Sequence, residues 1–396
     1  MPAEQKKILD LLDPDLYAGD PDPAYRWLRD HAPAYRDPNG VWGVSRWRDV
    51  MAAERDTRRY SSARGSRPLI EMSVSMINKD DPAHSRQRRL VAPRFTPGAV
   101  RRHSGRVREL AAGLVERAVA KGEAEVVEDL AAPLPAMVIC ELLGFDLEMW
   151  PRCKWWSETT MANAGYKHGD PRAPDSADAI ADFFAETAKL AAARRAEPRD
   201  DLVSVWTHST VEGAPLSEEE VVNEAILLLD GGAETTRSAI GQTVLALARR
   251  PDQRRLLLER PELLAGPAVE EFIRWATPIL NMRRTVTEDH ELHGETLREG
   301  DQVLLMYGSA NRDERVFADP GRFDVARSHN NHVAFGFGTH FCLGANLARL
   351  ELRILFEELL RRAPEFRLVE GSEPEFVPGY FTRTLRELHV EFAASR

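Results

Sequence analysis

Apolar residues recur at intervals of three and four along several stretches of the chain, which is the spacing expected of a helix with one buried face. This pattern predicts helices over four ranges: Val107–Ala120, Val221–Leu247, Ala268–Trp275 and Leu347–Leu360. Strand-like runs are short and scattered, and they cover Val41–Val44, Val303–Met306, Phe366–Val369 and Leu388–Phe392. Because these runs are too few for a doubly wound sheet, we expect a mainly α protein with small β regions.

Two helix starts are marked by residues that suit free backbone amides. Ser217, followed three residues later by Glu220, forms a capping box in front of the second predicted helix. Pro251 suits the first turn of the helix that comes next. No internal repeat, low-complexity tract or linker interrupts residues 1–396, so a single domain is the simplest organisation.

The composition is that of a globular protein with room for a large core. The chain has 396 residues, 43% of them hydrophobic, and a formal net charge of -10 that disfavours nucleic-acid binding. Its N-terminus is charged and contains prolines where a signal peptide needs an apolar core. The most apolar stretch, Leu130–Phe145, contains prolines and is shorter than the roughly 20 residues that span a membrane. We therefore expect a soluble, cytoplasmic protein with no membrane partner.

Three cysteines, an odd number, cannot form a complete disulfide framework, and this usage is typical of a reducing compartment. Cys140 lies in the apolar run LPAMVICELLG and Cys153 lies beside Trp155 and Trp156, so we interpret both as structural residues. Cys342 differs because it stands directly before a strongly helical segment, where unpaired amides and the helix dipole favour a thiolate.

The segment Phe335–Gly344, FGFGTHFCLG, surrounds this cysteine with small residues and a histidine. Three glycines let the backbone turn tightly and let a flat ligand approach closely: Gly336, Gly338 and Gly344. His340 adds a hydrogen-bond donor two residues before Cys342.

This segment resembles the haem-binding loop of the cytochrome P-450 superfamily, Phe-Gly-x-Gly-x-His-x-Cys-x-Gly, and agrees with it at every fixed position. The resemblance implies a triangular, helix-rich domain around haem b (iron protoporphyrin IX), with the Cys342 thiolate on the iron. It also implies that Phe335, Gly336, His340 and Gly344 contact the cofactor. From the residues alone, a buried structural cysteine is the alternative.

The predicted helix Val221–Leu247 is interrupted in its middle by the polar run DGGAETT. A helical glycine costs about 1 kcal/mol, so Gly231 and Gly232 call for a reason, such as room for a planar ligand. Glu234 and Thr235 supply an acid and an alcohol that can relay protons. The run resembles the oxygen-activating signature of the same superfamily, which implies catalytic roles for Glu234 and Thr235. A glycine kink with a back-bonded threonine is the alternative.

Glu271 and Arg274 stand three residues apart in VEEFIRW, where an ion pair on one helical face forms easily. The flanking apolar residues indicate a buried environment, in which each charge needs partners. Arg322, in PGRF, is our candidate for a third member. The set resembles the superfamily's Glu-x-x-Arg pair with its later arginine, which implies a role in folding.

His84 and Arg88 are four residues apart, so both can donate hydrogen bonds to one carboxylate. The resemblance adds Arg284, in RRTVT, and His340, which makes four implied partners for the two haem propionates. A solvated helix face is the alternative for His84 and Arg88 alone.

Eight arginines and no acidic residue lie between Arg86 and Arg108, in a chain whose net charge is -10. Such a local excess of positive charge favours an acidic partner. The resemblance implies a ferredoxin or flavodoxin with an NAD(P)H-dependent reductase, because no flavin or nucleotide domain is fused here. A solvated basic helix is the alternative.

Several loops contain apolar side chains that can line an adaptable substrate pocket. The candidates are Met72, Met76, Ile77, Ile279, Leu280, Met282, Tyr380 and Phe381. Ordinary core packing is the alternative for each of them. The segments MINKDDPAHSRQRRLV and SHNNHVAFGFGTHFCLG resemble actinobacterial members of the superfamily that hydroxylate steroids or terpenoids.

With the resemblance, these residues lead us to expect a monooxygenase that activates O2 with two externally supplied electrons. It would hydroxylate, or epoxidise, a hydrophobic small molecule such as a steroid, terpenoid or polyketide. Two other hypotheses remain. A peroxide-dependent haem enzyme would not need the pair Glu234 and Thr235, and a non-catalytic haem gas sensor would need neither that pair nor a docking face.

Overall fold

A computed structural model describes residues 8–71 and 74–393 of the chain. Its α-helices are α1 (Pro14–Ala18), α2 (Asp22–His31), α3 (Trp47–Arg55), α4 (Ala83–Val91), α5 (Pro97–Arg102), α6 (Ser104–Lys121), α7 (Pro133–Leu143), α8 (Trp150–Asn163), α9 (Ala177–Ala196), α10 (Leu202–Thr207), α11 (Glu218–Arg249), α12 (Pro251–Glu259), α13 (Pro267–Ala276), α14 (Tyr307–Ala310) and α15 (Ala345–Arg362). Shorter helical segments are η1 (Met76–Asn78), η2 (Ala92–Phe95), η3 (Val127–Ala131), η4 (Leu147–Met149), η5 (Pro261–Ala265) and η6 (Gly338–His340).

The strands are short and belong to several small sheets. They are β1 (Ala34–Arg36), β2 (Trp42–Val44), β3 (Tyr60–Ser61), β4 (Glu123–Glu125), β5 (Thr210–Val211), β6 (Ala214–Pro215), β7 (Met282–Val286), β8 (His290–Leu292), β9 (Glu295–Leu297), β10 (Gln302–Leu305), β11 (Phe366–Leu368), β12 (Glu375–Phe376), β13 (Leu385–Glu387) and β14 (His389–Phe392). The prediction of a mainly α protein with small β regions is confirmed.

The four predicted helices are α6, α11, α13 and α15, and each extends slightly beyond its apolar pattern. The capping box in front of α11 is present, because the Ser217 hydroxyl accepts from the Glu220 amide and the Glu220 carboxylate accepts from the Ser217 amide. Pro251 occupies the first turn of α12 as expected. Local chemistry therefore sets these helix starts.

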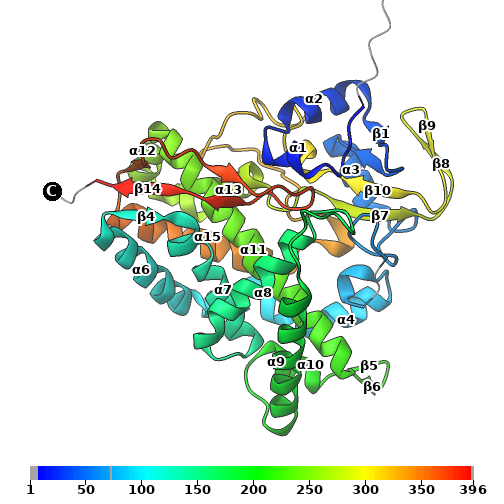
Figure 1. Ribbon diagram of the computed structural model, residues 1–396, viewed down its shortest axis with the longest axis horizontal. Helices are drawn as coiled ribbons and strands as arrows, with labels where there is room; N and C mark the ends of the chain where they lie inside the picture. The colour runs from blue at the N-terminus through cyan, green and yellow to red at the C-terminus, as the bar shows by residue number, and fades with distance from the viewer. Residues whose placement is uncertain (1–7, 72–73, 394–396) are drawn as a thin grey trace, which may run out of the picture.

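Helix α11 is 32 residues long and crosses the middle of the molecule (Figure 1). It packs against α7, α8 and α13. The helix runs without a break through Gly231 and Gly232, so the polar run in its middle does not interrupt it. Packing along so long a helix outweighs the roughly 2 kcal/mol that two glycines cost.

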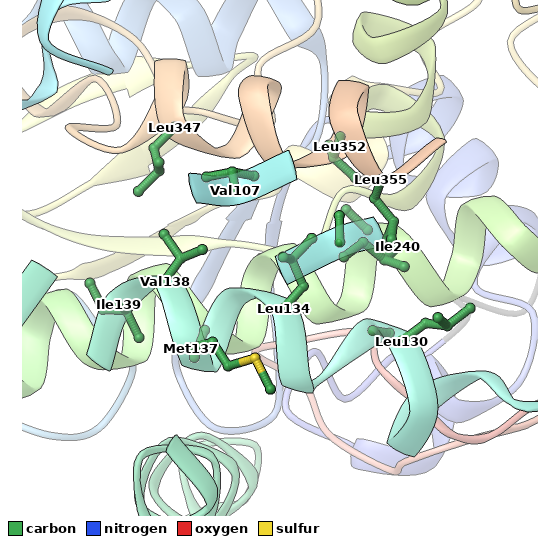
Figure 2. Close-up of a cluster of buried hydrophobic side chains, with 14 of the residues drawn as sticks. Val107, Leu130, Leu134, Met137, Val138, Ile139, Ile240, Leu347, Leu352 and Leu355 are labelled. Carbon is green, nitrogen blue, oxygen red and sulfur yellow. The ribbon is translucent and has the colours of Figure 1, made fainter. Parts of the chain in front are cut away.

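The largest apolar core joins α6, α7, α11 and α15. Figure 2 shows Leu134 and Val138 of α7 beside Val107 of α6, with Leu352 and Leu355 of α15 nearby. The stretch 130–145 lies in this core, and among the described residues no helix is long and apolar enough to cross a membrane. Cys140 and Cys153 are buried free thiols in the same core.

A five-stranded sheet in the order β1-β2-β10-β7-β3 forms one corner of a triangular outline (Figure 1). Strands β2 and β10 are parallel, with Trp42 opposite Val303, and the other neighbours are antiparallel. Strand β7, which the apolar pattern did not predict, contains Arg283 and Arg284. A second sheet, β11-β14-β4, lies against the helical core, beside α6 and α15 in Figure 1.

Candidate functional site

The loop before α15 folds around glycines that no other residue could replace without strain. Gly336 and Gly338 have φ angles of 65° and 69°, in the left-handed region. A Cβ atom on Gly338 would lie 2.7 Å from the carbonyl oxygen of Glu54 in α3. The Cys342 amide then donates to the Phe335 carbonyl over 2.9 Å, which closes the loop.

Cys342 stands at the entrance of α15 as a half-buried free thiol. Burial raises its pKa, and the Gly344 amide and the Arg88 guanidinium oppose this rise. Arg88 is fixed beside it by a 2.6 Å hydrogen bond from its guanidinium to the Phe341 carbonyl. Nothing lies within 4 Å of a Cβ atom placed on Gly344. The thiol therefore has partners that favour a thiolate and an open approach for a flat ligand.

The middle of α11 borders an open space on one side. Gly231 is exposed and Thr235 half-buried, although the helix around them is packed, and nothing lies within 4 Å of a Cβ atom on Gly231. Gly232 instead faces Ile139 of α7, whose side chain would lie 3.1 Å from such an atom. The Thr235 hydroxyl donates to the Gly231 carbonyl over 2.7 Å. The back-bonded threonine of the alternative interpretation is thus present, beside open space and in an unbroken helix.

Glu234 lies on a different face of α11 from Thr235. Its carboxylate accepts from Arg237 over 2.9 Å, and Arg237 also pairs with Glu158 of α8 over 2.8 Å. Burial raises the pKa of Glu234, and the Arg237 guanidinium opposes that rise. The acid is therefore adjacent to the alcohol along the chain but is held in an ion pair.

The predicted propionate partners lie close to one another. The rings of His84 and His340 are 4.2 Å apart between centroids. Burial, reinforced by the positive charges of Arg284, His84 and Arg88, lowers the pKa of His340 to about 3. The buried Nδ1 atom of His84 has no hydrogen-bond partner within the described part of the chain. Its nearest carboxylate, that of Asp81, is 3.6 Å away, beyond hydrogen-bonding range, so this nitrogen can still donate to a further anion, which fits a haem propionate.

Arg284 already has an acidic partner that the sequence analysis missed. It donates to Glu54 of α3 over 2.8 Å, and the Tyr307 hydroxyl donates to the same carboxylate. Both members of the ion pair are buried, with exposed side-chain fractions of 5% and 2%. No local pattern could have indicated Glu54, because 230 residues separate it from Arg284.

The buried ion pair of Glu271 and Arg274 is confirmed, but its predicted third member is wrong. The two side chains are 2.7 Å apart and fully buried. The third guanidinium is that of Arg327, 3.0 Å from Glu271. The Arg322 side chain is exposed, and only its backbone carbonyl accepts from Arg274 and Arg327. In this part of the chain the Arg322 side chain faces the surface, and the Arg327 side chain, five residues later, faces the buried Glu271.

The candidate substrate residues fall into two groups. Met72 lies outside the described residues. Met76 is buried in the main helical core, and Ile77 beside it is partly buried. The others form a second apolar cluster, with the segment at 279–282 beside that at 380–382: Ile279, Leu280, Met282, Tyr380 and Phe381. The structure therefore brings most of the predicted pocket residues together.

In the arginine-rich segment Arg86–Arg108, fewer guanidinium groups are available to a partner protein than the composition indicates. Four of its arginines pair with acids of the same chain: Arg86 with Glu212, Arg94 with Asp200, Arg106 with Glu141, and Arg108 with Glu357 and Glu358. Arg101 and Arg102, at the end of α5, are exposed and make no ion pair with another described residue. Arg89, in α4, is also exposed and makes no ion pair with a described residue, so these three arginines are the ones of the segment that are available for docking by charge.

Comparison with known proteins gives consistent matches. The family model described as Cytochrome P450 matches residues 171–379. A steroid C26-monooxygenase from Mycobacterium tuberculosis is 42% identical, over 98% of this chain and 98% of its own length. A methyl-branched lipid omega-hydroxylase from the same organism is 39% identical, over 93% of this chain and 87% of its own. A solved cytochrome P450 from Mycobacterium marinum, in complex with pseudoionone, has a TM-score of 0.90 at 32% identity and covers 99% of this chain and 100% of its own.

Proposed function

The chain belongs to the cytochrome P450 family, and from this premise we propose that Cys342 is the thiolate ligand of a haem b iron. The protein is a haem-dependent monooxygenase of hydrophobic small molecules. The observation that supports the ligand assignment is the position of Cys342, a half-buried thiol at the entrance of α15 with an open approach at Gly344. His84, Arg88, Arg284 and His340 would hold the haem propionates.

When bound, the haem supplies an iron atom that binds and activates O2. Side chains of α11 would control the delivery of protons to the site of O2 activation. The Thr235 side chain is partly accessible beside the open space at Gly231, and its hydroxyl can turn its hydrogen from the Gly231 carbonyl toward a bound ligand. Glu234 lies on another face of α11 in an ion pair with Arg237, so it would supply that proton only when this pair opens and the carboxyl is protonated.

We propose that the preferred site of attack is a terminal methyl group on a branched hydrocarbon chain. Two relatives support this, a steroid C26-monooxygenase at 42% identity and a methyl-branched lipid omega-hydroxylase at 39%. Their names denote oxidation at the end of a chain. The apolar cluster with Ile279, Met282 and Phe381 suits such a substrate.

The test is turnover of a branched-chain steroid and a methyl-branched lipid under labelled O2, with mass spectrometry of the products. We expect one labelled oxygen atom at a terminal methyl group. Oxidation of ring or internal carbons as the main reaction would contradict the proposed site of attack. The Cys342→Ser variant is the control and should give no labelled product.

Electrons would come from an acidic electron-transfer protein, a ferredoxin or flavodoxin, that docks near Arg101 and Arg102. Exposed, unpaired guanidinium groups in a chain of net charge -10 support this proposal.

A further inference from the structure

One cation lies among the apolar side chains of the predicted substrate pocket. Arg67 stands between β3 and η1, and its guanidinium carbon is 5.1 Å from the centre of the Phe381 ring. One of its nitrogens is 3.6 Å from the sulfur of Met161 in α8. The same group is 3.8 Å from an oxygen of Asp230 in α11. Arg67 therefore lies where α8, α11 and the loop of Phe381 meet.

Asp230 presents one free oxygen at this point. The Thr160 hydroxyl donates to its Oδ1 atom over 2.7 Å, and Oδ2 accepts no hydrogen bond from the described residues. Burial raises the pKa of Asp230 to about 7, with Arg67 and Thr160 opposing the rise. Asp230 directly precedes Gly231, whose missing side chain leaves open space. The free oxygen therefore belongs to the residue directly before the open space at Gly231.

Arg67 is equally short of partners. A guanidinium has five N–H donors, yet within residues 8–71 and 74–393 its only hydrogen-bond acceptor is the Met161 sulfur, a weak one. Its distance of 3.8 Å from Asp230 is beyond hydrogen-bonding range. The side chains keep exposed fractions of 27% for Arg67 and 12% for Asp230. A donor and an acceptor thus face each other with their capacity unused.

We propose that Arg67 and Asp230 together bind a hydroxyl group of the substrate. A hydroxyl both accepts and donates, so its oxygen can accept from Arg67 while its hydrogen goes to Asp230 Oδ2. A ketone can only accept, which leaves Asp230 unpaired. A carboxylate would meet the like charge of Asp230. The preferred substrates are hydrophobic alcohols.

This inference rests on the proposed function, and it adds the polar group by which the substrate is recognised. It predicts a strong preference between molecules of the same shape, because a ketone leaves a desolvated carboxylate without its hydrogen bond. We expect an alcohol to bind about tenfold more tightly than the matching ketone, the ratio that corresponds to about 1.4 kcal/mol.

The experiment is an absorption titration of the haem-loaded protein at pH 8.5, where Asp230, with its pKa of about 7, is ionised and can only accept. The titrants are two matched pairs, cholestanol with cholestanone, and hexahydropseudoionone with its alcohol. In the wild type each alcohol should have the lower dissociation constant. Asp230→Asn should abolish the preference, because an amide can donate to a ketone as well as accept from an alcohol. Arg67→Met should weaken binding of both members of a pair. The control Glu373→Gln changes an exposed carboxylate and should keep the wild-type ratio.

The outcomes separate this inference from the proposed function. Equal binding of alcohol and ketone by the wild type would overturn the hydroxyl assignment and leave the proposed site of attack intact, and this comparison needs no variant to fold. A preference that survives in Asp230→Asn would overturn it as well. Failure of all four compounds to bind would overturn the proposed substrate class, and the inference with it.

Discussion

The Thr235 side chain in α11 is partly accessible, and its hydroxyl donates a hydrogen bond to the carbonyl of Gly231, which borders an open space. We expect Thr235→Ala to divert electrons into hydrogen peroxide, because the hydroxyl that delivers protons is lost. Product per electron should fall at least about tenfold, while NAD(P)H consumption stays within a factor of about two. The measurement is the ratio of peroxide to product.

The neighbouring Thr236 gives a matched control, since it is buried and lies on another face of α11. Thr236→Ala should keep the wild-type ratio. An unchanged ratio in Thr235→Ala would contradict the proposed proton role. A gas sensor would form no product in any variant, and a peroxide-dependent enzyme would not respond to Thr235→Ala.

Glu224 makes stability depend on pH. Burial raises its pKa to about 7 from an ordinary value of 4.5, and the Met76 amide and Lys79 oppose the rise. Between these values the folded state keeps a proton that the unfolded chain has lost, so stability falls as pH rises through this window. The loss amounts to about 3 kcal/mol when complete.

We expect Glu224→Gln to remove this part of the slope, because glutamine cannot ionise and can still accept from the Met76 amide. Chemical denaturation at pH 5 and pH 8 measures it as a difference between variant and wild type. Glu219→Gln, at an exposed position of α11, is the control and should follow the wild type. Parallel slopes for Glu224→Gln and wild type would contradict the assignment.

At the scale of residues, the sequence identifies groups whose chemistry depends on near neighbours. Cys342, with its glycines and His340, forms a local pattern, and Gly231 and Thr235 are one helical turn apart. Glu54 and Arg67 were missed because their partners lie far along the chain. Such contacts depend on tertiary structure and leave no periodic signal.

At the scale of elements, the buried ion pairs of Glu271 with Arg274 and Arg327 connect α13 to the segment before the cysteine loop. Removing Arg327 would leave Glu271 with less compensation in a fully buried position. We expect Arg327→Ala to lower the free energy of unfolding by about 3 kcal/mol, and Arg322→Ala, at an exposed side chain, by less than about 0.5 kcal/mol. Denaturant titration of both variants measures the difference. Equal losses would contradict the reassignment from Arg322 to Arg327.

Helices proved more predictable than strands. The long amphipathic helices α6, α11, α13 and α15 have a strong period and marked ends, such as the Ser217 cap. Strand β7 escaped prediction because Arg283 and Arg284 break its apolar alternation. Each guanidinium donates to a group far along the chain, Arg283 to the Ile70 carbonyl and Arg284 to Glu54. The glycines of α11 were read as an interruption, yet packing keeps the helix continuous.

At the scale of the whole molecule, the docking proposal makes the rate of electron transfer depend on surface charge. We expect Arg101→Gln with Arg102→Gln to slow reduction by an acidic ferredoxin at least about fivefold at low salt, and the difference from wild type to shrink as salt rises. Stopped-flow absorbance measures the rate. Arg298 directly follows β9 and is exposed, so Arg298→Gln is the control for the loss of a positive charge. An unchanged rate in the double variant at low salt would contradict the docking proposal.

The overall arrangement was not derivable from local patterns. The sheet joins β2 to β10, and nothing in either short run specifies the other as its partner. The triangular outline and the haem came from the resemblance in the cysteine loop, and family membership now supports both. Local chemistry did predict the class of the fold and the candidate thiolate ligand, Cys342.

The most direct test of the central claim is the absorption spectrum of the dithionite-reduced protein under carbon monoxide, taken for the wild type and for Cys342→Ser. A thiolate on the iron predicts a strongly red-shifted Soret band in the wild type and its loss in the variant. The same band in both proteins, or a wild type that binds no haem, would contradict the assignment of Cys342.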